Sequence, residues 1–167
     1  MAKVVLSKST WAVMALTYHV EIFTQVHFKS SIEPEAELSE LWKDVFLYHW
    51  KEESQHAVID ELEWRREDAK VSDAERDRSV TDLIDLVVAV DGILQGQADA
   101  DADYFVAAIE RNLDAAEAQA VKDVILEAYR WQYIVSGVKD GRFFGVLTEL
   151  IDDDQARRVS EALGPLL

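Results

Sequence analysis

The sequence predicts an all-α protein, a bundle of four long helices with short extra helices at its C-terminal end. Apolar residues recur at spacings of three and four along nearly all of the 167 residues, which is the helical period. Two Pro and six Gly are too few for the many turns of a β-sandwich or barrel. Because no linker, internal repeat or low-complexity segment divides the chain, residues 1–167 are expected to form a single domain.

The first two predicted helices cover residues 9–29 and 38–68. Each follows hydroxyl side chains that can accept a hydrogen bond from the free N–H groups of a first helical turn. The candidate caps are Ser7, Ser9 or Thr10 for the first helix and Ser39 for the second. Between the two helices, the segment from Ser30 to Pro34 is typical of a helix break.

The third predicted helix begins between residues 72 and 80 and continues to about residue 98. Its middle, residues 83–91, is apolar almost all round, so we expect it to be the most buried helix. A separate short helix is predicted at 103–112.

The fourth predicted helix covers residues 115–136, with Asp114 as its N-cap and Gly137 at its stop position. Two short helices, at 145–151 and 154–163, complete the chain. Four long helices with short connections predict a helical bundle.

The chain is strongly acidic and contains no cysteine. Seventeen Lys and Arg face 33 Asp and Glu, a formal net charge of −16, which disfavours nucleic acid and anionic membranes as partners. The absence of cysteine excludes disulfides, thiolate metal sites and cysteine nucleophiles. With no signal-peptide cleavage site and no apolar stretch of roughly 20 residues, we expect a cytoplasmic protein.

All four histidines lie in the first 56 residues, and two of them suggest a site on the second helix. At about 100° per residue, His49, Glu53 and His56 lie within one narrow stripe that continues an apolar face. Glu21 occupies a similar position on the first helix, among apolar and aromatic neighbours. Because buried ionisable groups are costly unless they are paired or bind a metal, these residues are candidate metal ligands. A hydrogen-bonded Glu–His pair without metal is the alternative.

This arrangement resembles the ferritin-like di-iron carboxylate proteins. Glu21, followed by His49-x-x-x-Glu53-x-x-His56, is similar to half of the site in p-aminobenzoate N-oxygenase-type enzymes. The resemblance implies a ferritin-like bundle that binds iron, or manganese, with Glu21 and Glu53 as carboxylate ligands and His56 as a nitrogen ligand. It implies His49 as an additional ligand and Asp60 as a group that orients a histidine.

The second half of the sequence departs from that family pattern. The third helix offers Asp85 and Asp91, and the fourth offers Glu127, but Arg130 stands where the pattern has histidine. Three interpretations stay open: one metal ion, a carboxylate-rich pair completed by Asp91, Asp85 or Glu127, or a half site whose remainder is lost or comes from another chain. Arg130 either lines a pocket or pairs with Asp91 or Asp85.

The resemblance also implies a function, O₂-dependent oxidation of a small organic substrate. The alternative is a non-catalytic binding or oligomerisation module with a degenerate metal site, and a homodimer is compatible with either. His19 and His27 lie on other faces of the first helix, where we expect surface or interface positions.

Overall fold

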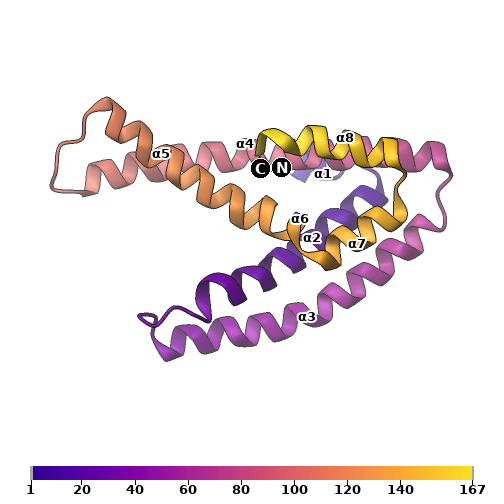
Figure 1. Cartoon of the computed structure of the whole chain (residues 1–167), viewed down its shortest axis with the longest axis horizontal. Coiled ribbons are helices and arrows are strands. Elements are labelled where there is room, and N and C mark those ends of the chain that lie inside the picture. Colours follow the sequence, from indigo (N-terminus) through magenta and orange to yellow (C-terminus); the bar gives the residue numbers. More distant parts are fainter. Residues whose placement is uncertain (1, 167) are drawn as a thin grey trace.

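The computed structural model describes residues 2–166, and these contain helices and no strands. The all-α class is therefore confirmed (Figure 1). The helices are α1 (Ala2–Val5), α2 (Thr10–His27), α3 (Glu40–Asp68), α4 (Asp73–Ala108), α5 (Ala115–Arg130), α6 (Ser136–Lys139), α7 (Gly141–Leu150) and α8 (Asp153–Leu163). Two π-helical turns, Phe28–Ile32 and Trp131–Val135, extend α2 and join α5 to α6, and a 3₁₀ turn, Gly164–Leu166, follows α8.

The long helices begin where side chains satisfy their first-turn N–H groups. Ser9 accepts from the backbone N–H of Ala12, and Ser39 accepts from that of Trp42, so both serine caps are confirmed. Asp114 forms a reciprocal capping box with Glu117, which confirms the predicted start of α5.

α2 is the central helix of the molecule, and it contacts α3, α4, α6 and α7 (Figure 1). Its buried side chains include Trp11, Tyr18 and Ile22. The expectation that the apolar segment of α4 would be the most buried was wrong, because Val88 in that segment is 58% exposed. α2 is surrounded by other helices, whereas at this point α4 is covered on one side only.

Two predicted boundaries were also wrong. α4 continues to Ala108 without the interruption predicted before residue 103, because Ala98 and Ala102 stay buried along its contact with α5. Gly137 does not end a helix, since the π turn leads into α6, and α6 ends at Lys139. Asp140 then caps α7 by accepting from the backbone N–H of Arg142, so α7 begins earlier than predicted.

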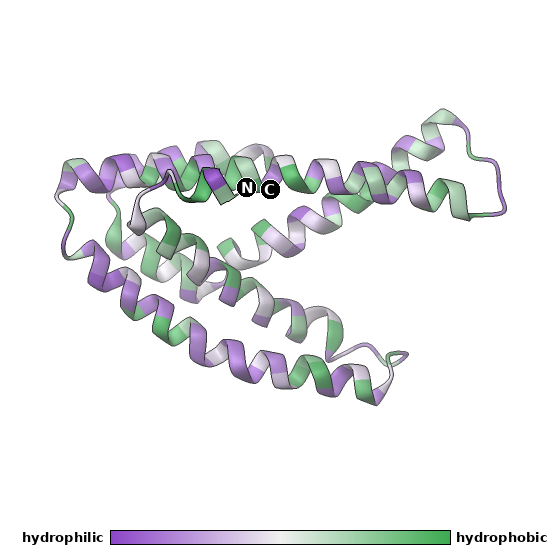
Figure 2. Cartoon of the chain, turned by 180° about the vertical axis from the view of Figure 1, so that it is seen from behind, coloured by the Kyte–Doolittle hydropathy of each residue, from purple (hydrophilic) through white to green (hydrophobic). Residues whose placement is uncertain are grey.

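The four long helices form two pairs that meet at one end of the molecule and diverge at the other (Figure 1). The α2–α3 pair and the α4–α5 pair are joined by a core that includes Trp11, Trp64, Tyr18 and Phe143. In this core the Trp64 and Phe143 rings stack with centroids 5.8 Å apart. α2 is largely hydrophobic, while α3 is hydrophilic with separate hydrophobic bands (Figure 2). Among the described helices, none is both long and apolar enough to cross a membrane.

Candidate metal centre

The antiparallel packing of α2 on α3 is fixed by three hydrogen bonds. Trp11 Nε1 donates to Asp68 over 2.8 Å, the Tyr18 hydroxyl donates to Glu61 over 3.3 Å, and Gln25 Nε2 donates to the Glu53 carbonyl over 3.2 Å. From one of these bonds to the next, the residue number increases on α2 and decreases on α3 by nearly the same amount. This register places Glu21 opposite the segment of α3 that carries the predicted histidine motif.

Three of the predicted ligands come together between these helices. One ligand atom each from Glu21, Glu53 and His56 lies within 4.8 Å of the other two. His56 Nδ1 donates to a Glu53 oxygen over 2.8 Å and lies 4.0 Å from a Glu21 oxygen. The carboxylates are mostly covered, while the His56 side chain is 46% exposed. The group is therefore open to solvent on its histidine side.

The two carboxylates share a proton in the absence of a cation. Burial, followed by the hydrogen bond and the negative charge of Glu53, raises the pKa of Glu21 to about 8. The pKa of Glu53 is lowered, first by the hydrogen bond from Glu21 and then by those from His56 and His49. Burial also raises the pKa of nearby Asp60. Negative charge is thus concentrated here, and the hydrogen bond with Glu53 together with the nearby carboxylates raises the pKa of His56, whose protonated ring offsets part of that charge.

His49 lies beside this group and contacts only one of its members. Its Nε2 lies 2.5 Å from the Glu53 oxygen that does not accept from His56. His49 therefore holds the orientation of the Glu53 carboxylate. Glu52, which the sequence reasoning did not single out, lies 3.9 Å from His56 Nε2 and adds negative charge at the exposed rim.

The acidic candidate ligands from the second half of the sequence lie elsewhere in the molecule. Asp91 is buried and accepts two hydrogen bonds from Arg130, at 2.7 and 3.0 Å, and a third from Gln95. The Arg130–Asp91 pair is thus the structural ion pair that the sequence left as one alternative. Asp85 pairs with Lys8 at 2.6 Å. Glu127 is exposed on α5. The structure does not bring Asp85, Asp91 or Glu127 to the Glu21–Glu53–His56 group.

His19 is buried, which corrects the expectation of a surface or interface position. Its Nε2–H donates to the Ile134 carbonyl over 3.0 Å, and its ring packs against Phe23 and Phe143. Burial lowers the pKa of His19 to about 4. His27 is half-buried with its ring against Phe46. The sequence could not reveal the burial of His19, because the π turn that covers it has no recognisable sequence signal.

His19 predicts a specific acid sensitivity. Its folded-state pKa of about 4 is below the unfolded value of 6.5, so the unfolded chain binds a proton that the native protein excludes. Stability from this group is complete above pH 6.5 and decreases by about 3 kcal/mol as the pH falls to 4. In urea unfolding of metal-free protein, His19→Gln should lose less stability than wild type across this interval. Equal losses of stability in the two proteins would contradict the low pKa of His19. Comparing the two proteins cancels the opposite contribution of Glu21.

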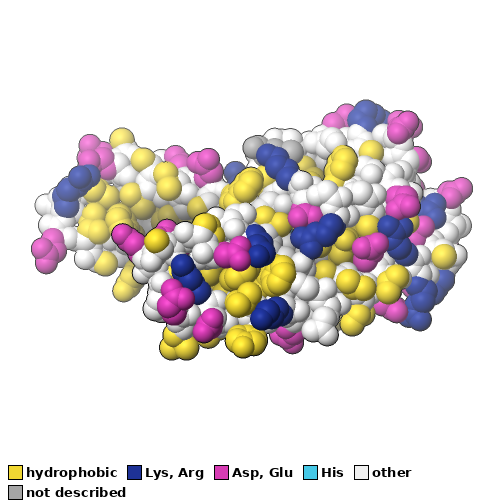
Figure 3. Space-filling model, turned by 60° about the horizontal axis from the view of Figure 1, so that its bottom comes forward, with side chains coloured by type: hydrophobic (Ala, Val, Ile, Leu, Met, Phe, Trp, Pro, Cys, Tyr) yellow, Lys and Arg dark blue, Asp and Glu magenta, His cyan; other side chains and the backbone are white. Residues whose placement is uncertain are grey.

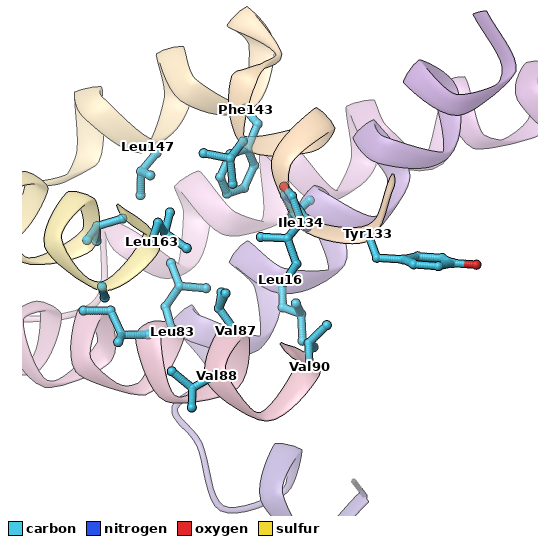
Figure 4. Close-up of a pocket in the computed structure, with 15 residues that line it drawn as sticks. Leu16, Leu83, Val87, Val88, Val90, Tyr133, Ile134, Phe143, Leu147 and Leu163 are labelled. Carbon is cyan, nitrogen blue, oxygen red and sulfur yellow. The ribbon is translucent and has the colours of Figure 1, made fainter. Parts of the chain in front are cut away.

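A separate apolar cavity lies between α2, α4, α7 and α8 (Figure 4). Leu16, Leu83, Val87 and Phe143 are among its lining residues, and only His19 and Tyr133 contribute polar side-chain groups. Its volume is about 40 Å³, far below the ~150 Å³ that accommodates benzene. It contains none of the clustered carboxylates, so we interpret it as a gap in the core rather than a substrate pocket.

The chain matches no protein-family model, no curated protein and no solved structure, so the interpretation of this site rests on its geometry and chemistry.

Proposed function

We propose that this protein is a ferritin-like metalloprotein that binds a transition-metal ion, iron by preference, through Glu21, Glu53 and His56. The observation that carries the proposal is the convergence of two carboxylates and one imidazole, from two antiparallel helices, within 4.8 Å of one another. In helical bundles, carboxylate and Glu-x-x-His ligands on facing helices bind metal in this way.

The donor set and its charge fit such an ion. Ligand atoms about 2.1 Å from one ion lie about 3 to 4 Å apart, so small side-chain rotations suffice to close the observed group. Carboxylate and imidazole together suit iron and manganese, and the chain has no thiolate to favour softer metals. A divalent cation would replace the proton that Glu21 and Glu53 share, and so would relieve the concentration of negative charge.

The proposed reaction is O₂-dependent oxidation of a small organic molecule. When bound, the metal supplies the redox chemistry with O₂. The protein positions Glu53, because His49 contacts one of its oxygens and Gln25 binds its backbone carbonyl. In the single chain both histidine side chains are 46% exposed, so the centre is open to solvent.

The first test is metal stoichiometry, by elemental analysis of untagged protein before and after aerobic loading with ferrous iron. We expect bound metal in wild type and none in His56→Ala, with the helical circular dichroism of both proteins alike. His27→Ala is the matched control, since His27 lies on the same pair of helices outside the group. No metal in wild type after loading would refute the proposal.

The alternative function is a non-catalytic module that binds a partner or a second copy. The observation that favours it is that Asp91 and Glu127 do not reach the Glu–His group, so one chain provides only half of a di-iron ligand set. Iron binding without substrate-dependent O₂ consumption would support this alternative.

A further inference from the structure

One face of α3 has exposed apolar side chains at the spacing of a coiled coil. Leu41, Tyr48 and Leu62 are 75%, 69% and 61% exposed, and Val45 and Ile59 are more than half exposed. Together with Glu52 and Gln55 they recur at alternating intervals of four and three residues over three heptads. We call this set the α3 seam, and its members are Leu41, Val45, Tyr48, Glu52, Gln55, Ile59 and Leu62.

The α3 seam points away from the rest of the molecule. Trp50, Ala57 and Trp64 recur every seven residues on the opposite side of α3, and Ala57 and Trp64 are buried in the core. One side of α3 therefore packs on α2, while a second apolar stripe has no partner among residues 2–166. In a view of the molecule from the side on which α3 lies, hydrophobic side chains recur along the surface between acidic and basic ones (Figure 3).

We infer that the α3 seam is the docking surface for a second copy of this chain, with the two α3 helices antiparallel about a two-fold axis. The seam is self-complementary in that orientation. Val45 would face Leu62 and Tyr48 would face Ile59 of the second copy, and each pair occurs twice by symmetry. At the centre, Glu52 would face Gln55, whose amide can donate to the carboxylate.

Charge distribution favours antiparallel over parallel pairing. A parallel pair would place Glu52 directly against Glu52 of the second copy, which leaves two like charges in the seam. In the antiparallel pair, Asp44 lies beside Arg65 of the second copy. Asp44 forms no ion pair within the described chain, whereas Arg65 already pairs with Glu61 and Glu149, so this contact would add Asp44 to that cluster. Flanking charges of this kind set the orientation of coiled-coil partners.

The docked pair would also enclose the proposed metal centre. His49 and His56 lie seven residues apart along the same edge of the α3 seam. Antiparallel docking therefore brings His49 of one copy beside His56 of the other, and two half sites become neighbours across the two-fold axis. This consequence rests on the proposed function, whereas the docking itself does not.

Light scattering coupled to gel filtration tests the docking directly. Wild type should have the mass of two 19.0 kDa chains, and Val45→Glu with Ile59→Glu should have the mass of one, with unchanged helical circular dichroism. The matched control is Ile93→Glu with Val124→Glu, two exposed apolar positions outside the seam, which should remain dimeric. A monomeric wild type, or a dimeric seam variant, would overturn the inference.

Cysteine cross-linking tests the orientation, because the natural chain has no cysteine to interfere. In an antiparallel pair, Tyr48→Cys and Ile59→Cys should form disulfide-linked dimers only when the two variants are mixed and allowed to exchange. Dimers formed by either variant alone would overturn the antiparallel arrangement.

Metal binding by the monomeric seam variant separates the two proposals. We expect its iron affinity to fall at least tenfold, because the second copy no longer covers the histidines. Dimers that bind no iron in any form would refute the proposed function and leave the docking intact. Unchanged affinity in the monomer would overturn the claim that docking encloses the centre.

Discussion

Glu53→Gln is expected to lower iron affinity at least ~100-fold while leaving the metal-free fold intact. Glu53 links the other groups of the centre, since Glu21, His49 and His56 all contact its side chain. The amide keeps the shape of the side chain but removes the negative charge that a cation requires. Loss of an outer-sphere partner alone costs metal sites about 10–100-fold, so loss of a ligand should cost more. Titration calorimetry with ferrous iron under anaerobic conditions would measure the change.

The metal-free stability of the same variant gives a second, independent readout. The negative charge of Glu53 contributes to raising the pKa of Glu21, whereas hydrogen bonds from Glu21, His56 and His49 lower the pKa of Glu53 and so stabilise its charged form. These two contributions oppose each other, so removing the charge should change the free energy of unfolding at pH 8 by no more than about 1 kcal/mol. The matched control is Glu52→Gln, because Glu52 is exposed and meets only the rim of His56. Marked destabilisation of metal-free Glu53→Gln with unchanged iron affinity would identify a purely structural Glu–His network.

Gly137→Ala is expected to destabilise the protein by about 2–4 kcal/mol, through overpacking and a weakened hydrogen bond. A Cβ at this position would lie 2.5 Å from His19 Nε2, 2.7 Å from His19 Cδ2 and 3.2 Å from Phe23 Cβ. The His19 ring cannot easily move away, because it is buried between Phe23 and Phe143 and donates to the Ile134 carbonyl. Urea denaturation followed by circular dichroism would measure the loss.

Two comparisons isolate this steric cause. Gly96→Ala is the matched control, because a Cβ at Gly96 of α4 meets no atom within 4 Å and alanine favours a helix. It should be neutral or stabilising by up to about 1 kcal/mol. In a double-mutant cycle, His19→Ala should remove much of the destabilisation caused by Gly137→Ala, since it removes the ring that the added Cβ would contact. Additive effects would argue against the close contact.

The sequence alone predicted the starts of the long helices and the part of the candidate site that lies on α3. Helical periodicity and cap residues such as Ser9, Ser39 and Asp114 act within one or two turns, so they can be recognised without the fold. The same holds for His49, Glu53 and His56, because helical geometry alone places them on one stripe. Glu21 was predicted as a further ligand from its similar position on the neighbouring helix, and the structure brings it to Glu53 and His56.

Only the tertiary structure decided which faces are covered. The apolar segment of α4 looked buried by composition, yet α2 occupies the centre, because burial depends on how many helices surround an element. Pairing of Asp91 with Arg130 and the burial of His19 against Gly137 join residues more than 35 positions apart, and no local pattern encodes such contacts. The α3 seam likewise became visible only after the structure showed that the other side of α3 already packs on α2.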